Sequence, residues 1–77
     1  MAKNNHYVNG FLIQTRRNDE GEIVAKIDLQ GKVMLGMLRE GKMVPFTPHD
    51  QFEDSIEAPT PEQLLAMKHA AFLHSDD

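Results

Sequence analysis

Thr60-Pro61-Glu62-Gln63 carries a signal for the start of a helix, and Thr47-Pro48-His49-Asp50 carries the same signal earlier in the chain. Each places a threonine at the cap, a proline at the first helical position and an acceptor side chain three residues after the threonine. The threonine oxygen accepts a free backbone N–H of the first turn, and proline has no N–H to leave unsatisfied. The sequence therefore predicts a short helical segment within residues 47–58 and a C-terminal helix over residues 60–74.

The residues ahead of these two signals have the pattern of β-strands. The clearest is residues 22–30, where a period of two puts Ile23, Ala25, Ile27 and Leu29 on one face. Successive side chains of a strand point to opposite faces, so this alternation predicts a half-buried strand. A polar turn at 17–21 joins it to a strand over 8–16, and further strands are expected at 33–38 and 43–46. Pro45 cannot donate to a ladder and places the last strand at an edge.

A sequence in which the strands come first and the helices second predicts an α+β fold, here with one domain over residues 1–77. We expect a three- to four-stranded antiparallel meander (6–46), an acidic helical or loop segment (47–58) and the C-terminal helix (60–74). The chain has no cysteine, so disulfides and thiolate ligands are excluded. No apolar run approaches the ~20 residues that span a bilayer, and no signal peptide is recognisable, so we expect a cytoplasmic protein.

Two stretches carry more apolar surface than a small monomer can easily bury. Residues 33–38 are apolar on both faces, and the C-terminal helix is apolar nearly all round. On a helical wheel one broad face holds Leu64, Leu65, Met67, Ala71 and Phe72, while Ala66, Ala70 and Leu73 cover much of the rest. Large exposed apolar patches usually mark contacts. We therefore expect a homodimer or a bound partner, with Met67, Lys68 and Phe72 in the contact. Lys68 would either extend along the apolar surface or pair with an acid across the interface.

Charge is distributed unevenly along the chain, whose net charge is −4. Residues 44–77 hold seven acidic residues against one lysine, whereas residues 1–43 are slightly basic. Carboxylates around two apolar anchors can steer a segment toward a basic surface. The residues expected to bind a partner in this way are Asp50, Phe52, Glu53, Asp54 and Ile56.

These features favour a small acidic protein–protein interaction module that acts by stoichiometric binding and not as an enzyme. It would regulate or inhibit a larger protein or nucleoprotein machine with a basic surface, as proteins of phages and mobile elements do. One alternative is a nucleic-acid-binding protein that uses Arg16, Arg17 and Lys26 on a strand face. Another is a minimal metal or acid–base site at His49 and Asp50. No cofactor is expected.

Overall fold

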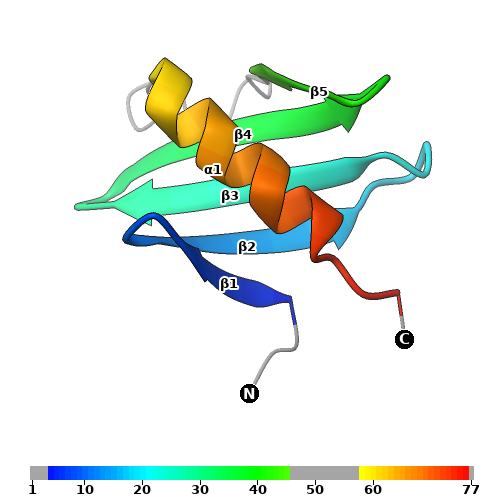
Figure 1. Cartoon of the computed structure of the whole chain (residues 1–77), viewed down its shortest axis with the longest axis horizontal. Helices are drawn as coiled ribbons and strands as arrows, with labels where there is room; N and C mark the ends of the chain where they lie inside the picture. The colour runs from blue at the N-terminus through cyan, green and yellow to red at the C-terminus, as the bar shows by residue number, and fades with distance from the viewer. Residues whose placement is uncertain (1–3, 46–57, 77) are drawn as a thin grey trace.

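The computed structural model describes residues 4–45 and 58–76, and there it shows one antiparallel sheet with one helix across it (Figure 1). The elements are β1 (Asn5–Val8), β2 (Phe11–Arg17), β3 (Ile23–Leu29), β4 (Lys32–Arg39), β5 (Lys42–Pro45) and α1 (Pro61–Phe72). The strands lie in the sheet in the order of the sequence, as a meander. The predicted α+β class and antiparallel sheet are confirmed.

The described sheet has five strands, whereas the sequence predicts three or four. The difference comes from residues 8–16, which the sequence predicts to be a single strand. Val8 pairs with Phe11 across a two-residue turn at Asn9-Gly10, and both turn residues have positive φ. Asn-Gly between two apolar runs is the strongest short hairpin signal, because asparagine and glycine tolerate the left-handed backbone of a type I′ turn. That signal separates β1 from β2.

Two further hairpins repeat this turn. Gln30-Gly31 joins β3 to β4, and Glu40-Gly41 joins β4 to β5, with positive φ at all four residues. The longer β2–β3 turn is organised by Asn18, whose side-chain oxygen accepts the backbone N–H groups of Glu20 and Glu22. These local turns fix the register of the whole meander.

The predicted start of the C-terminal helix is confirmed at α1. Thr60 caps it, its hydroxyl accepts the N–H of Gln63, and the Gln63 side chain accepts the N–H of Thr60 in return. Pro61 occupies the first turn. The helix ends at Phe72, two residues earlier than predicted. The predicted helical segment within residues 47–58 falls almost wholly on residues 46–57, outside the described part.

α1 crosses one face of the sheet diagonally and contacts all five strands (Figure 1). The core between them combines apolar residues of the sheet with small residues of the helix. Its buried members are Ile13, Ala25, Ile27, Met34, Ala66, Met67 and Ala70. Alanine on the helix and Ala25 on β3 let the two backbones approach closely, and Gly36 of β4 is buried as well. Apolar burial of this kind is the main term that stabilises the fold.

The orientation of α1 differs from the predicted helical wheel. Ala66 and Ala70 are fully buried, whereas Leu65 is 49% exposed and Phe72 is 62% exposed. The sequence predicts both large residues on one broad apolar face together with Met67, and it places Met67 and Phe72 in a partner contact. Ala66, Met67 and Ala70 face the sheet, whereas Leu65 and Phe72 face outward. The inward residues pack against Ile13, Ala25, Ile27 and Met34.

Candidate functional site

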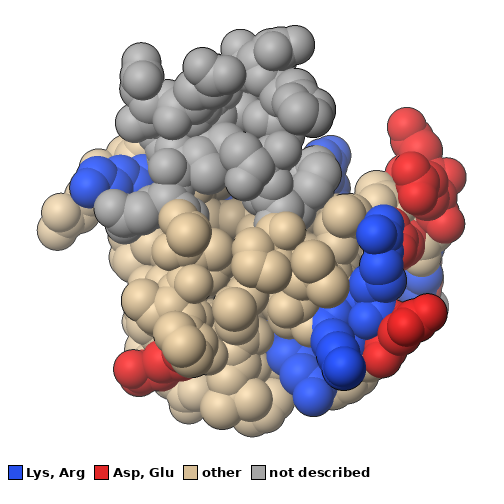
Figure 2. Space-filling view, turned by 90° about the horizontal axis from the view of Figure 1, so that it is seen from above, with Lys and Arg blue, Asp and Glu red and all other residues tan. Residues whose placement is uncertain are grey.

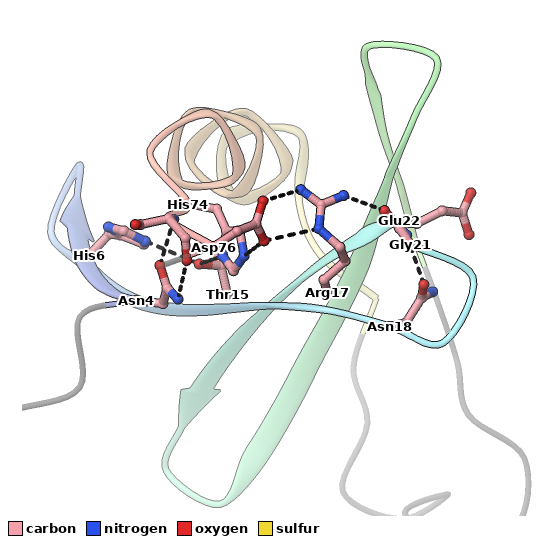
Figure 3. Close-up of polar contacts among 10 residues, drawn as sticks. Asn4, His6, Thr15, Arg17, Asn18, Gly21, Glu22, His74 and Asp76 are labelled. Carbon is pink, nitrogen blue, oxygen red and sulfur yellow. Dashed lines mark hydrogen bonds and ion pairs between the residues drawn. The ribbon is translucent and has the colours of Figure 1, made fainter.

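The end of the chain is fastened to the start of the sheet by a set of polar side chains, here called the C-terminal clasp (Figure 3). It consists of residues 74–76 with Asn4, His6, Thr15 and Arg17. The Asn4 side chain donates to the Ser75 carbonyl at 3.0 Å and accepts the Ser75 N–H at 2.9 Å. The clasp therefore joins positions more than 70 residues apart in sequence.

Thr15 lies at the centre of the clasp. Its Oγ1 is 3.1 Å from His6 Nε2 and 2.9 Å from His74 Nδ1. Thr15 is only 6% exposed and the His74 side chain only 4%. Hydrogen bonds formed away from water are stronger than exposed ones, and their loss leaves polar atoms unpaired.

Asp76 closes the clasp at its exposed side. Arg17 donates to both carboxylate oxygens, at 3.0 and 2.7 Å, and His74 Nε2 lies 3.0 Å from Oδ1. These hydrogen bonds, those from Arg17 first, lower the pKa of Asp76 to about 2. Asp76 is thus an ionised acceptor across the whole neutral range.

A hydroxyl, an imidazole and a carboxylate in a row have the connectivity of a catalytic triad. Here the hydroxyl belongs to the buried Thr15 and is already engaged by two histidines. An attacking oxygen must come within about 3–3.5 Å of the carbon it attacks, and the burial of Thr15 leaves no room for that approach. The arrangement therefore supports fastening of the chain end and not nucleophilic chemistry.

The helix held by the clasp presents an apolar surface to solvent, here called the outer ridge. It consists of Leu65 and Phe72, spaced seven residues apart on α1, and Leu73 just after the helix, which is 60% exposed. Lys68 lies beside the ridge, with Nζ 6.0 Å from the centre of the Phe72 ring. This is the outer limit of a cation–π contact. Leu65, Phe72 and Leu73 are thus three large apolar side chains exposed along one helix and the residue after it, and exposed apolar side chains brought together are candidates for partner contacts.

The predicted contact residues on α1 separate in the structure. Phe72 lies on the outer ridge and Lys68 is half-buried beside it. Met67, by contrast, is fully buried in the core, so it offers no surface to a partner, contrary to the prediction. The sequence did not place Leu65 and Leu73 in the contact. The other predicted contact residues, Asp50, Phe52, Glu53, Asp54 and Ile56, lie outside the described residues, as does the His49/Asp50 alternative.

The basic residues of the nucleic-acid alternative also separate. Arg16 and Lys26 are on the sheet face opposite α1, because their strand neighbours Thr15 and Ala25 face the helix. Arg17 is on the helix face and bonded to Asp76. Lys and Arg side chains gather next to Asp and Glu at the end of the molecule that carries the β2–β3 and β4–β5 turns (Figure 2). There Arg39 Nε pairs with Glu22 at 2.8 Å, so part of this positive charge is neutralised locally.

No family model matches the chain, and its comparison with curated proteins and solved structures gave no match either. Among the described residues, no helix has the length and apolar character needed to cross a bilayer. Residues 4–45 and 58–76 also contain no group of three His, Asp or Glu side chains placed to hold a metal ion. Within the described residues, the outer ridge and the clasp are the features that bear on function.

Asp76→Asn should loosen the clasp at neutral pH without unfolding the sheet. The neutral amide loses the ionised acceptor that Arg17 and His74 share, and charge-assisted hydrogen bonds are the stronger kind. We expect several-fold faster amide exchange at Ser75 and an unchanged rate at Ile27. Because the pKa of Asp76 is lowered in the folded state, its carboxylate stabilises the closed clasp above about pH 4. This stabilisation is lost as the pH falls toward about 2.

Hydrogen exchange followed by NMR measures both amides in one sample. Asp28→Asn is the matched control, since Asp28 is exposed on the opposite face of the sheet. Equal exchange at Ser75 in both variants would show that the carboxylate of Asp76 does not hold the chain end.

Proposed function

We propose that this protein is a small interaction module that binds a larger protein stoichiometrically, with the outer ridge at the centre of the contact. The observation that carries the proposal is the exposure of Leu65, Phe72 and Leu73. Solvent-facing positions of a helix on a sheet are ordinarily polar. Aromatic and aliphatic anchors at i and i+7 are the pattern of a helix that enters an apolar groove. Its role would be that of a regulator or inhibitor acting in the cytoplasm.

Surface area favours a larger partner over a second copy of the chain. α1 has 12 residues, so it is about 18 Å long, and a single outward face of such a helix falls short of the ~800 Å² per partner of a standard interface. Two copies would meet through the same convex ridge, since a twofold contact uses one surface twice, and would bury a narrow strip. A concave groove encloses the flanks of the helix as well. A homodimer is the second candidate, and the mass of the complex distinguishes it from a complex with a larger partner.

A photo-crosslinking amino acid at two aromatic positions tests the proposal in cells of the natural host. Benzoylphenylalanine replaces Phe72 on the outer ridge and, as the matched control, Tyr7, which is 81% exposed on β1. We expect one discrete adduct, heavier than two 8.7 kDa chains, from position 72 and none from position 7. Adducts formed only from position 7, or adducts with nucleic acid, would contradict the proposal. They would indicate that the protein binds through the sheet face opposite α1.

Charge on the ridge should abolish that adduct. Leu65→Lys puts an ammonium group where an apolar anchor is expected, and loss of a central anchor typically weakens binding by 2 kcal/mol or more, which is about thirtyfold. Because Leu65 is half exposed, the melting temperature should stay within a few degrees of the wild type. An adduct that survives Leu65→Lys at full yield would place the contact elsewhere.

A further inference from the structure

Two histidines in the clasp share one hydroxyl group. His6 of β1 and His74 after α1 each place a ring nitrogen within 3.1 Å of Thr15 Oγ1, and the other ring nitrogen of His74 contacts Asp76. Three hydrogen bonds therefore lie in a row from His6 to Asp76. The threonine at the middle has a single proton to donate, so the proton positions along the row depend on one another.

The carboxylate fixes these positions when both imidazoles are neutral. Asp76 only accepts, so His74 Nε2 must carry a proton. A neutral imidazole has one N–H, which leaves His74 Nδ1 bare to accept from the Thr15 hydroxyl. Thr15 has then used its only proton, so His6 must donate from Nε2. The geometry thus assigns both histidines to the Nε2–H tautomer.

One additional proton leaves every hydrogen bond intact. If it binds His6 at Nδ1, the row is unchanged. If it binds His74 at Nδ1, that N–H donates to Thr15, the hydroxyl turns to donate to His6 Nε2, and the proton of His6 moves to its Nδ1. In both cases each of the three contacts still has one donor and one acceptor.

A second proton breaks this pattern. Both imidazolium rings then donate to Thr15, and its hydroxyl proton has no acceptor in the row. The charged groups brought to His74 by its described neighbours are His6 from β1, Arg17 from β2 and Asp76 from the clasp itself, whereas His69 on α1 is exposed. His6, His74 and Arg17 would then place three positive charges around the single carboxylate of Asp76.

We propose that the clasp is a proton-operated switch, which stays closed with neither or one of His6 and His74 protonated and releases residues 74–76 when both are charged. Histidine takes up a proton as the pH falls, so acidification drives the release. The switch is independent of the proposed partner, because it needs only residues of this chain.

Imidazole ¹⁵N NMR on the full chain gives the first test. Near pH 8 we expect His6 and His74 both as the Nε2–H tautomer, with the exposed His69, which lies outside the clasp, as the reference. An Nδ1–H tautomer at His74 would overturn the assignment and with it the switch.

The opening itself is read from the Ser75 amide, which is bonded to Asn4 in the closed clasp. In the range where the open form holds one more proton than the closed form, the open-to-closed ratio should rise about tenfold per unit fall in pH. Thr15→Ser keeps the hydroxyl and should keep this slope. His6→Gln retains an amide that can bond Thr15 but takes up no proton, so its slope should be nearly flat. If the open-to-closed ratio of His6→Gln rises with falling pH as steeply as that of the wild type, the switch is refuted.

Discussion

Met67→Asp should abolish folding of this protein. Met67 is fully buried between α1 and the sheet, within the cluster that contains Ile13 and Ile27. A carboxylate there would either remain charged without a partner or take up a proton at a cost of several kcal/mol. A domain of this size, with no disulfide, rarely has more than about 3–5 kcal/mol of stability from its core. Far-UV circular dichroism and a one-dimensional proton spectrum at neutral pH would show an unfolded chain.

Leu65→Asp is the matched control for that experiment, because it puts the same carboxylate on the same helix two residues earlier. Leu65 is 49% exposed, and surface substitutions usually change stability by about 0.5 kcal/mol or less. We therefore expect a folded protein with a nearly unchanged denaturation midpoint. A folded Met67→Asp beside an unfolded Leu65→Asp would mean that α1 presents the opposite face to the sheet.

Local sequence signals predicted much of the fold. Four predicted features depend only on residues close together in sequence, and the structure contains each of them. They are the alternating strand within residues 22–30, the polar turn that follows β2, the edge position of Pro45 and the capping box at Thr60. The Asn9-Gly10 turn was equally local, and recognising it would have separated β1 from β2. Its omission made five strands look like three or four.

The face of α1 could not be predicted in the same way. A helix that is apolar nearly all round has no polar side to identify its exterior. What orients α1 is the surface opposite, where the fully buried Ala25 of β3 leaves room for the helix, while the space beside Gly36 of β4 is filled by the Met43 side chain. Ala66 and Ala70 can approach that surface, whereas Leu65 and Phe72 would hold the helix away. This information is in the tertiary arrangement of the sheet and not in residues 60–74.

The clasp was outside the reach of sequence reasoning for a related reason. Its members come from β1, β2 and the residues after α1, and none carries a recognisable motif. A buried threonine between two histidines becomes visible only when His6 and His74 are brought to the same atom. The net charge of the C-terminal third did not indicate it either, since Asp76 acts there through its geometry with Arg17.

Ala66→Leu combined with Ala70→Leu tests directly whether small residues set the distance between α1 and the sheet. Both alanines are fully buried and lie four residues apart, on one face of the helix. Overpacking a filled core typically costs about 1–3 kcal/mol at each site. Two adjacent insertions should therefore remove most of the stability of the domain. Urea denaturation should show a folded baseline that is short or absent.

Helix propensity does not obscure this result, because leucine and alanine are both strong helix formers. His69→Leu supplies the control: it adds leucine to the same helix at an exposed position, and its denaturation midpoint should stay close to that of the wild type. If the double variant were as stable as His69→Leu, the contact between α1 and the sheet would tolerate large side chains. The inward orientation of the alanines would then need another cause, and the exposure of Leu65 and Phe72 would no longer follow from packing.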